Sequence, residues 1–189
     1  MHVISTIRPS VLFAATMSLL AMAAAAGSST ARTFAGHSWS IEAPPGYEEM
    51  SQRPDDRSLI TAFAPAPRAD GTRPMVMVTL RDITGSSGTP EFRRKVAEMA
   101  IAGIEARREE WQLETSETKV GEMPVTRYAW RGVTVPAADG APVRVRARGV
   151  MLVGVHEGVA FMLHTQDIDA HADETLPLNE KVLGTFRIR

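Results

Sequence analysis

Residues 149–167, GVMLVGVHEGVAFMLHTQD, consist of two apolar runs on either side of the dipeptide Glu157-Gly158. A dipeptide that ends in glycine, between two runs rich in β-branched and aromatic side chains, indicates a two-residue β-hairpin turn. Such a turn fixes the pairing, because each step away from it on one strand matches a step on the other. The pairs that we expect are His156–Val159, Gly154–Phe161, Val150–Thr165 and Arg148–Asp167.

A third strand is predicted before this hairpin. The sequence predicts strands over residues 123–136, 142–155 and 159–166, with another two-residue turn at Asp139-Gly140. The expected partners across the first two strands are Trp130–Gly149 and Tyr128–Met151. An aromatic ring then lies over a glycine twice, since Phe161 also faces Gly154. The middle of the chain is therefore predicted to be an antiparallel meander.

One helix start is clearly marked by Thr89-Pro90-Glu91, because threonine caps free amides, proline suits the first helical position and glutamate favours the positive end of the helix dipole. The apolar positions that we expect to pack on the sheet are Phe92, Val96, Met99, Ala100, Gly103 and Ile104. A second helix is predicted over residues 173–183, ended by Gly184, and a last strand over 185–188 is expected to return to the sheet.

Upstream, the sequence predicts an entry hairpin over residues 34–41 and two strands over 59–64 and 74–83. In the last of these, Met75 and Met77 alternate with Val76 and Val78, so both faces are apolar. A strand that is apolar on both faces needs cover on both. The predicted fold class is therefore α/β of the α+β type, a three-layer α/β/α sandwich with a largely antiparallel central sheet.

The N-terminus is predicted to be a secretory signal over residues 1–26. Arg8 supplies the positive charge, and the 16-residue apolar stretch from Val11 to Ala26 is shorter than the roughly 20 residues that span a membrane, which favours a cleaved signal over the alternative of an uncleaved anchor. Cleavage is expected after Ala26, with Ala31 as the alternative, which leaves a single domain over residues 27–189. We therefore expect a periplasmic or secreted protein that meets the membrane only through the signal segment before cleavage.

Composition excludes several classes of function. The net charge is −1, so no overall field attracts the chain to nucleic acid, and nucleic acid is not an expected partner. There is no cysteine, which excludes disulfides, thiolate catalysis and iron–sulfur clusters. No cofactor is predicted.

The layout resembles the fold shared by the photosystem PsbP proteins, the Ran-binding Mog protein and the bacterial DcrB-type envelope proteins. The resemblance extends from Phe34 to Ile188. The segments that carry it are FAGHSWSIEAPPGYEEM, TPEFRRKVAEM, KVGEMPVTRYAWRG, GVMLVGVHEGVAFMLHTQD and EKVLGTFRIR. It implies an accessory or binding module without catalytic activity. The resemblance supplies no site residue for any position of this chain.

The first candidate site is a stripe of arginines. Arg144, Arg146 and Arg148 alternate along one strand and so share a face, with Arg131 expected beside Arg148 on the neighbouring strand. This stripe can receive an acidic partner or an anionic ligand. The alternative is that the charges keep an exposed region soluble and protect it from pairing with other sheets.

The second candidate site is the segment HTQDIDAHAD, where His164, Asp167, Asp169 and His171 are ligand types for zinc, copper or manganese. The alternative is that the acidic residues serve as loop and helix-cap groups while His164 lies on a strand face. No zinc-enzyme spacing is present.

The leading hypothesis is an exported, non-catalytic envelope protein that binds an unidentified protein or small ligand. The other hypotheses are a divalent-metal-binding periplasmic protein and a hydrolase with dispersed catalytic residues.

Overall fold

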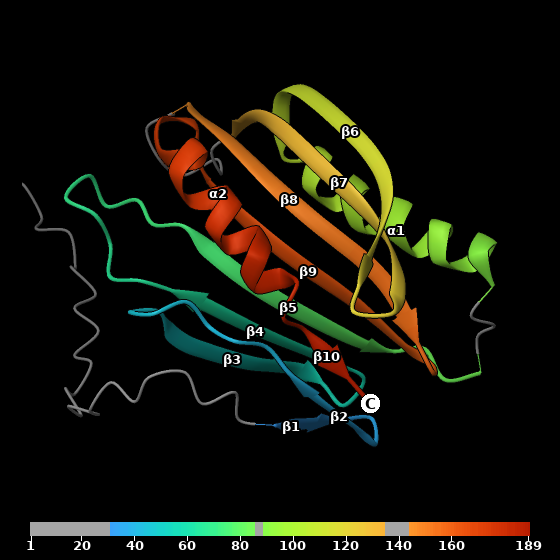
Figure 1. Cartoon of the computed structure of the whole chain (residues 1–189). Coiled ribbons are helices and arrows are strands. Elements are labelled where there is room, and N and C mark those ends of the chain that lie inside the picture. The colour runs from blue at the N-terminus through green and yellow to red at the C-terminus, as the bar shows by residue number, and fades with distance from the viewer. Residues whose placement is uncertain (1–30, 86–88, 135–143) are drawn as a thin grey trace, which may run out of the picture.

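The computed structural model describes residues 31–85, 89–134 and 144–189, so the predicted signal segment and the turn at Asp139-Gly140 lie outside the described residues. The large sheet has the strand order β3-β4-β5-β9-β8-β7-β6, and its neighbouring strands are all antiparallel. These strands are β3 (Glu48–Asp55), β4 (Ser58–Ala64), β5 (Met75–Asp82), β6 (Arg108–Val120), β7 (Met123–Thr134), β8 (Val145–His156) and β9 (Val159–Ile168). The fold is therefore α+β with a largely antiparallel sheet (Figure 1).

The predicted register of the central strands is confirmed. The turn at Glu157-Gly158 pairs His156 with Val159, and the same register brings Arg148 opposite Asp167. Across β7 and β8, Trp130 lies opposite Gly149 and Tyr128 opposite Met151, as predicted. Both Glu157 and Gly158 have positive φ, at 43° and 83°, which is the conformation that a two-residue type I′ turn requires.

The two expected contacts between a ring and a glycine are present and very close. A Cβ atom at Gly149 would lie 2.5 Å from Cζ2 of Trp130, and one at Gly154 would lie 2.3 Å from Cζ of Phe161. Neither position has room for a side chain. The glycines let two large aromatic residues lie flat against the sheet, one on each face.

Two helices lie on opposite faces of the sheet. Helix α1 (Pro90–Glu105) begins as predicted, with the Thr89 hydroxyl accepting a hydrogen bond from the amide of Phe92. Its Ala97 and Ile101 pack against the cluster that contains Trp130. Helix α2 (Asp169–Leu183) lies in front of the sheet in Figure 1, and α1 lies behind it. Within the described ranges, no helix is long and apolar enough to cross a membrane.

A small second sheet completes the face on which α2 lies. It contains β1 (Arg32–Phe34), β2 (His37–Ser40) and β10 (Arg187–Ile188) in the order β1-β2-β10. The last strand was predicted to return to the main sheet, and that prediction was wrong, because β10 pairs with β2 instead. Its Ile188 and the neighbouring Phe186 are buried in the same core as Trp39 of β2.

The predicted packing stripe of α1 needs correction. Met99 is 60% exposed and Gly103 is exposed, while the fully covered positions are Ala97 and Ile101. The reason is that α1 packs mainly on β6, β7 and β8. The helix therefore covers one half of its face of the sheet. The other half carries partly buried side chains such as Met77 and borders a cavity.

Candidate functional site

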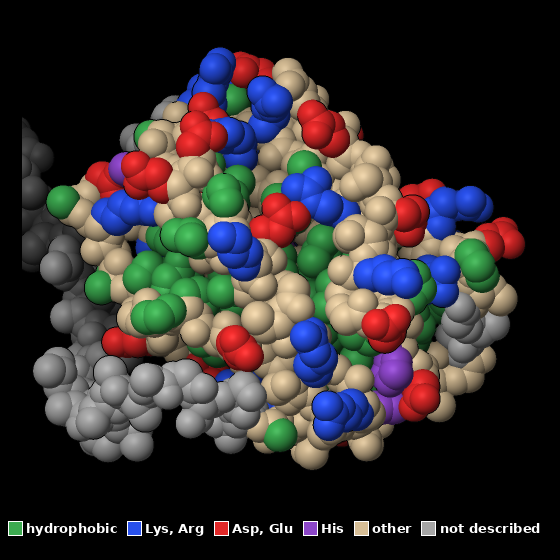
Figure 2. Space-filling view, viewed as in Figure 1, with side chains coloured by type: hydrophobic (Ala, Val, Ile, Leu, Met, Phe, Trp, Pro, Cys, Tyr) green, Lys and Arg blue, Asp and Glu red, His purple; other side chains and the backbone are tan. Residues whose placement is uncertain are grey.

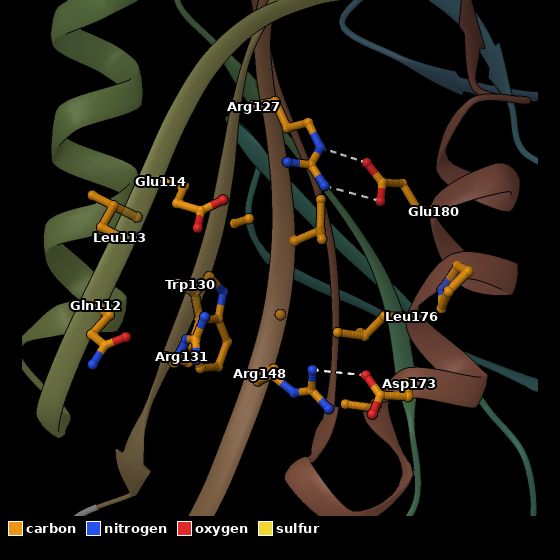
Figure 3. Close-up of a pocket in the computed structure, with 15 residues that line it drawn as sticks. Gln112, Leu113, Glu114, Arg127, Trp130, Arg131, Arg148, Asp173, Leu176 and Glu180 are labelled. Carbon is orange, nitrogen blue, oxygen red and sulfur yellow. Dashed lines mark hydrogen bonds and ion pairs between the residues drawn. The ribbon is translucent and has the colours of Figure 1, made fainter.

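A groove runs between α2 and strands β6, β7 and β8, on the face of the sheet seen in Figure 2 (close-up in Figure 3). It encloses about 520 Å³. Strand alternation turns every second residue of β7 and β8 into it, and helix α2 forms the opposite wall. Its apolar surface comes from Ala129, Val150, Ala172, Leu176 and Pro177, and its charged groups are Glu114, Arg127, Arg131, Arg148, Asp173 and Glu180.

One end of the groove is closed by an ion pair between β7 and α2. The guanidinium of Arg127 donates two hydrogen bonds to the carboxylate of Glu180, at 2.6 and 3.1 Å (Figure 3). The hydrogen bond to Glu180 raises the pKa of Arg127, so this group keeps its charge. The two-pronged geometry fixes the position of α2 relative to β7 at this point.

A second ion pair crosses the groove at the other end. Nη1 of Arg148 donates to Asp173 at 2.9 Å, and Nε lies 2.6 Å from the carboxylate of Asp169. The hydrogen bond from Arg148 lowers the pKa of Asp173. Arg148 thus holds the first turns of α2 against β8, while its side chain remains 27% exposed.

Arg127 and Arg148 form ion pairs with carboxylates of α2, whereas Arg131, the third arginine of the groove, does not in the described residues. It lies directly opposite Arg148 in the β7–β8 ladder and is exposed. Among the residues that the structure describes, no ion-pair partner is found for it. Like charges placed opposite each other on neighbouring strands repel. The carboxylates of α2 pair with Arg148, so Arg131 is the groove arginine left to face an apolar wall, with Glu114 of β6 as the nearest carboxylate of the lining along the ladder.

The predicted arginine stripe is divided by the structure. Arg131 and Arg148 line the groove together, as the sequence suggested. Arg144 and Arg146 instead form ion pairs with β6, since Arg144 contacts Glu109 at 2.6 Å and Arg146 contacts Glu110 at 3.1 Å. These pairs are more than half exposed, so they contribute little to stability. They lie at the edge of the sheet, outside the groove.

The residues predicted as metal ligands are not brought together. Asp167 lies on the α2 face, where it accepts two hydrogen bonds from Arg68, at 2.8 and 2.7 Å, and one from the Thr175 hydroxyl at 2.7 Å. His164 lines a cavity on the opposite face. Asp169 pairs with Arg148, and His171 lies 4.0 Å from Asp70. Each of these side chains except His164 thus has another partner.

That second cavity lies between α1 and strands β5, β8 and β9. It encloses about 330 Å³ and is lined mainly by apolar side chains, among them Met75, Met77, Met151 and Met162. Nε2 of His164 is buried there without a hydrogen-bond partner in the described part of the chain. Burial, and then the charge of Arg108, lowers the pKa of His164 to about 4. The imidazole is therefore neutral at ordinary pH.

Sequence reasoning did not identify Arg127 and Glu180 as residues of the groove. They lie far apart in the chain, and no local spacing relates them. A weak signal was present in β7, where Arg127 and Arg131 both fall on the face opposite the buried Tyr128 and Trp130. The position of α2 over that face could not be derived from the sequence, since α2 was predicted to begin at Asp173 and begins at Asp169.

No family model matches the chain, and no curated protein matches it by sequence. Among solved structures it is similar to LpqN of Mycobacterium tuberculosis, described as involved in cell envelope biogenesis, with a TM-score of 0.53 and 11% identity over 87% of this chain and 92% of that one. It is also similar to a protein from Bacteroides thetaiotaomicron VPI-5482, with a TM-score of 0.50 and 12% identity over 80% of this chain and 45% of that one. At these identities the chain shares a fold with both.

Proposed function

We propose that the protein is an exported accessory protein of the cell envelope that acts by binding an anionic group in the groove between α2 and β6–β8. The group belongs to a small ligand or to an acidic segment of a protein partner. The proposal includes a signal segment over residues 1–26 and a single domain over residues 27–189. The likeness to LpqN, a protein involved in cell envelope biogenesis, supports the cellular location.

The observation that carries the proposal is the pair Arg131 and Arg148, which lie opposite each other in the groove with carboxylate partners for Arg148 only. Guanidinium groups bind carboxylates and phosphates through two parallel hydrogen bonds. The apolar side of the groove, with Leu176 and Pro177, suits the hydrocarbon part of such a ligand.

The chemistry of the groove supports binding rather than turnover. Its cationic groups are arginines, which do not release a proton near neutral pH. Among the described residues that line it, serine, threonine, tyrosine and histidine are absent. Two of its carboxylates, Asp173 and Glu180, are hydrogen-bonded to arginines.

We further propose that the chain is a PsbP/Mog/DcrB-like three-layer sandwich, with α1, the large sheet and α2 as its layers. Support comes from the packing of Ala97 and Ile101 on one face and of Leu183 on the other. The PsbP-like resemblance agrees with an accessory role without catalysis.

The test uses two ligands with the same tail. Monododecyl phosphate, kept below its critical micelle concentration, is titrated into the protein beside dodecyl maltoside, which has no charge. We expect the phosphate to bind and the maltoside to bind at least about tenfold more weakly, because a charge-assisted hydrogen bond contributes about 1.5 kcal/mol or more. Raising the salt concentration is expected to weaken the binding of the phosphate.

The matched variants are R131Q and R144Q, which remove the same charge from the groove and from the sheet edge. We expect R131Q to lose most of the affinity and R144Q to keep it. An equal loss in both variants would mean that overall charge, not the groove, attracts the ligand. If the phosphate binds no better than the maltoside, but an acidic protein from the envelope binds in an Arg131-dependent way, the ligand is a protein segment.

A further inference from the structure

Two β-hairpin turns from distant parts of the chain meet at one corner of the molecule. In the first, Ala35 and Gly36 have positive φ and His37 begins β2; in the second, His156 ends β8 and Glu157 begins the turn. Figure 2 shows histidine atoms at the surface beside acidic ones, in the region where β2 and the β8–β9 turn lie in Figure 1. This corner belongs neither to the groove nor to the cavity of His164.

The side chains at this corner converge. One ligand atom from each of His37, His156 and Glu157 lies within 4.8 Å of those of the other two. The two imidazole rings meet edge to face with their centroids 5.9 Å apart. At a zinc ion with ligand bonds of about 2.0–2.1 Å, tetrahedral donors lie roughly 3.4 Å from one another. The three groups are therefore within a small side-chain adjustment of a common metal position.

The backbone on both sides is held in place. Ser38 and Arg189 exchange two backbone hydrogen bonds of 2.9 Å, which fix β2 against the end of the chain. The amide of Ile83 donates to the carbonyl of Gly158 at 2.8 Å, which fixes the second turn. Ligands on rigid elements bind a metal with little loss of conformational freedom.

Glu157 also has an unusual backbone conformation. Its φ is 43°, in a turn position that favours asparagine, aspartate or glycine, so glutamate is a poor choice for local structure alone. Its side chain is nevertheless the carboxylate that faces the two histidines. Ala35 in the facing turn and Glu110 adopt the same conformation, so the convergence of the carboxylate with the two histidines, and not the backbone, indicates a ligand.

We propose that His37, His156 and Glu157 form a binding site for a divalent transition-metal ion of the zinc class. Two imidazole nitrogens and one carboxylate oxygen are a known donor set for zinc, with a fourth position left for water or an outside ligand. The bound ion joins the small sheet to the β8–β9 hairpin of the large sheet. In an exported chain without cysteine, it supplies the crosslink that a disulfide cannot.

The experiment measures zinc affinity and melting temperature of the full chain after treatment with a chelator. Zinc is titrated in competition with a chromophoric chelator. We expect one ion per chain, a rise in melting temperature of several degrees when zinc is added, and an affinity that falls by more than about tenfold in H156Q and in H37Q. H171Q is the matched control, because His171 lies outside the cluster, and it is expected to bind zinc like the wild type.

E157N separates the metal role from the turn role. Asparagine adopts positive φ more readily, so the metal-free variant is expected to melt at a higher temperature than the metal-free wild type, while its zinc affinity falls. A variant that gains stability and keeps its zinc affinity would show that Glu157 is a turn residue only. Zinc binding that is equal in the wild type and in H37Q/H156Q would overturn the proposal.

Discussion

At the level of single residues, Gly154 shows how the sheet makes room for its core. Phe161 is fully buried against Phe186, with ring centroids 5.1 Å apart, so it cannot move away from a new side chain. We expect G154A to lower the free energy of unfolding by about 2–3 kcal/mol, at the upper end of the cost of overpacking. The measurement is chemical denaturation.

The control for this prediction is G103A on the exposed side of α1, where an added Cβ has no neighbour within 4 Å. There the change is expected to raise stability by about 0.5–1 kcal/mol, because alanine favours the helix. Equal stability of G154A and the wild type would mean that the Phe161 ring is loosely packed.

Asp167 is the charged residue whose loss should matter most for stability. Its side chain is fully buried, and Arg68, Thr175 and the amide of Ile168 donate hydrogen bonds to it. Burial on its own would raise the pKa of Asp167, but these hydrogen bonds outweigh it and hold the pKa below its usual value. The buried carboxylate therefore stays ionised and joins the segment that carries Arg68 to α2.

We expect D167N to destabilise the protein by about 3 kcal/mol, because it leaves Arg68 without its anion and replaces an acceptor with a donor. The matched variant is D173N, whose carboxylate is 87% exposed and also pairs with an arginine. It should leave the free energy of unfolding close to that of the wild type, because an exposed ion pair is weak. Similar losses in both variants would show that burial does not decide the strength of these pairs.

At the level of elements, the sequence predicts the strands that have at least one buried face and misses a strand that has none. The hairpin of β8 and β9 consists of two apolar runs on either side of a clear turn, and the turn sets its register, so the register followed from the sequence. Strand β6 (Arg108–Val120) is polar along most of its length and was missed, since periodicity needs a buried face to be visible. Its many charges are typical of an edge strand that avoids pairing with other chains.

The missed contacts of α1 have a similar cause. Its apolar side chains occupy a wider arc of the helix than the sheet covers, and the sequence does not show which part of the arc is covered. The covered part is the side with Ala97 and Ile101, whose contacts lie on β7 and β8. The groove likewise depends on where α2 crosses the sheet, which is a tertiary property. Arg131 and Arg148 were predictable as neighbours, whereas the helix beside them was not.

At the level of the whole molecule, the two faces of the sheet are filled differently. The face of α2 is closed by the small sheet, with Trp39 and Phe186 as fully buried side chains, and it leaves the arginine groove on one side. On the opposite face, α1 covers half of the sheet, and the cavity that contains His164 lies at the border of the covered half. A buried imidazole without a hydrogen-bond partner makes the stability of the whole fold depend on pH.

The direction of that dependence follows from the lowered pKa of His164. Its pKa is about 4 in the folded protein, because of burial and then Arg108, and about 6.5 in an unfolded chain. Above pH 6.5 the imidazole is neutral in both states, and the fold has its full stability from this group. Between pH 6.5 and 4 the unfolded chain takes up a proton that the folded protein does not, so stability falls as the pH falls. Below pH 4 both states are protonated and this loss ends.

From pH 7 to pH 5 we expect the wild type to lose about 2 kcal/mol more of its free energy of unfolding than H164Q, whose amide does not titrate. M77L is the control, since it alters the same cavity and keeps the imidazole, and it should retain the slope of the wild type. The measurement is chemical denaturation at half-unit steps of pH. A slope in H164Q equal to that of the wild type would assign the acid sensitivity to other groups.

The carboxylate of Asp167, whose folded pKa lies below its usual value, acts at still lower pH, because its stabilising effect is lost only as the pH falls below about 4. Acidification is therefore expected to lower the free energy of unfolding of the whole fold in two stages, first through His164 and then through Asp167.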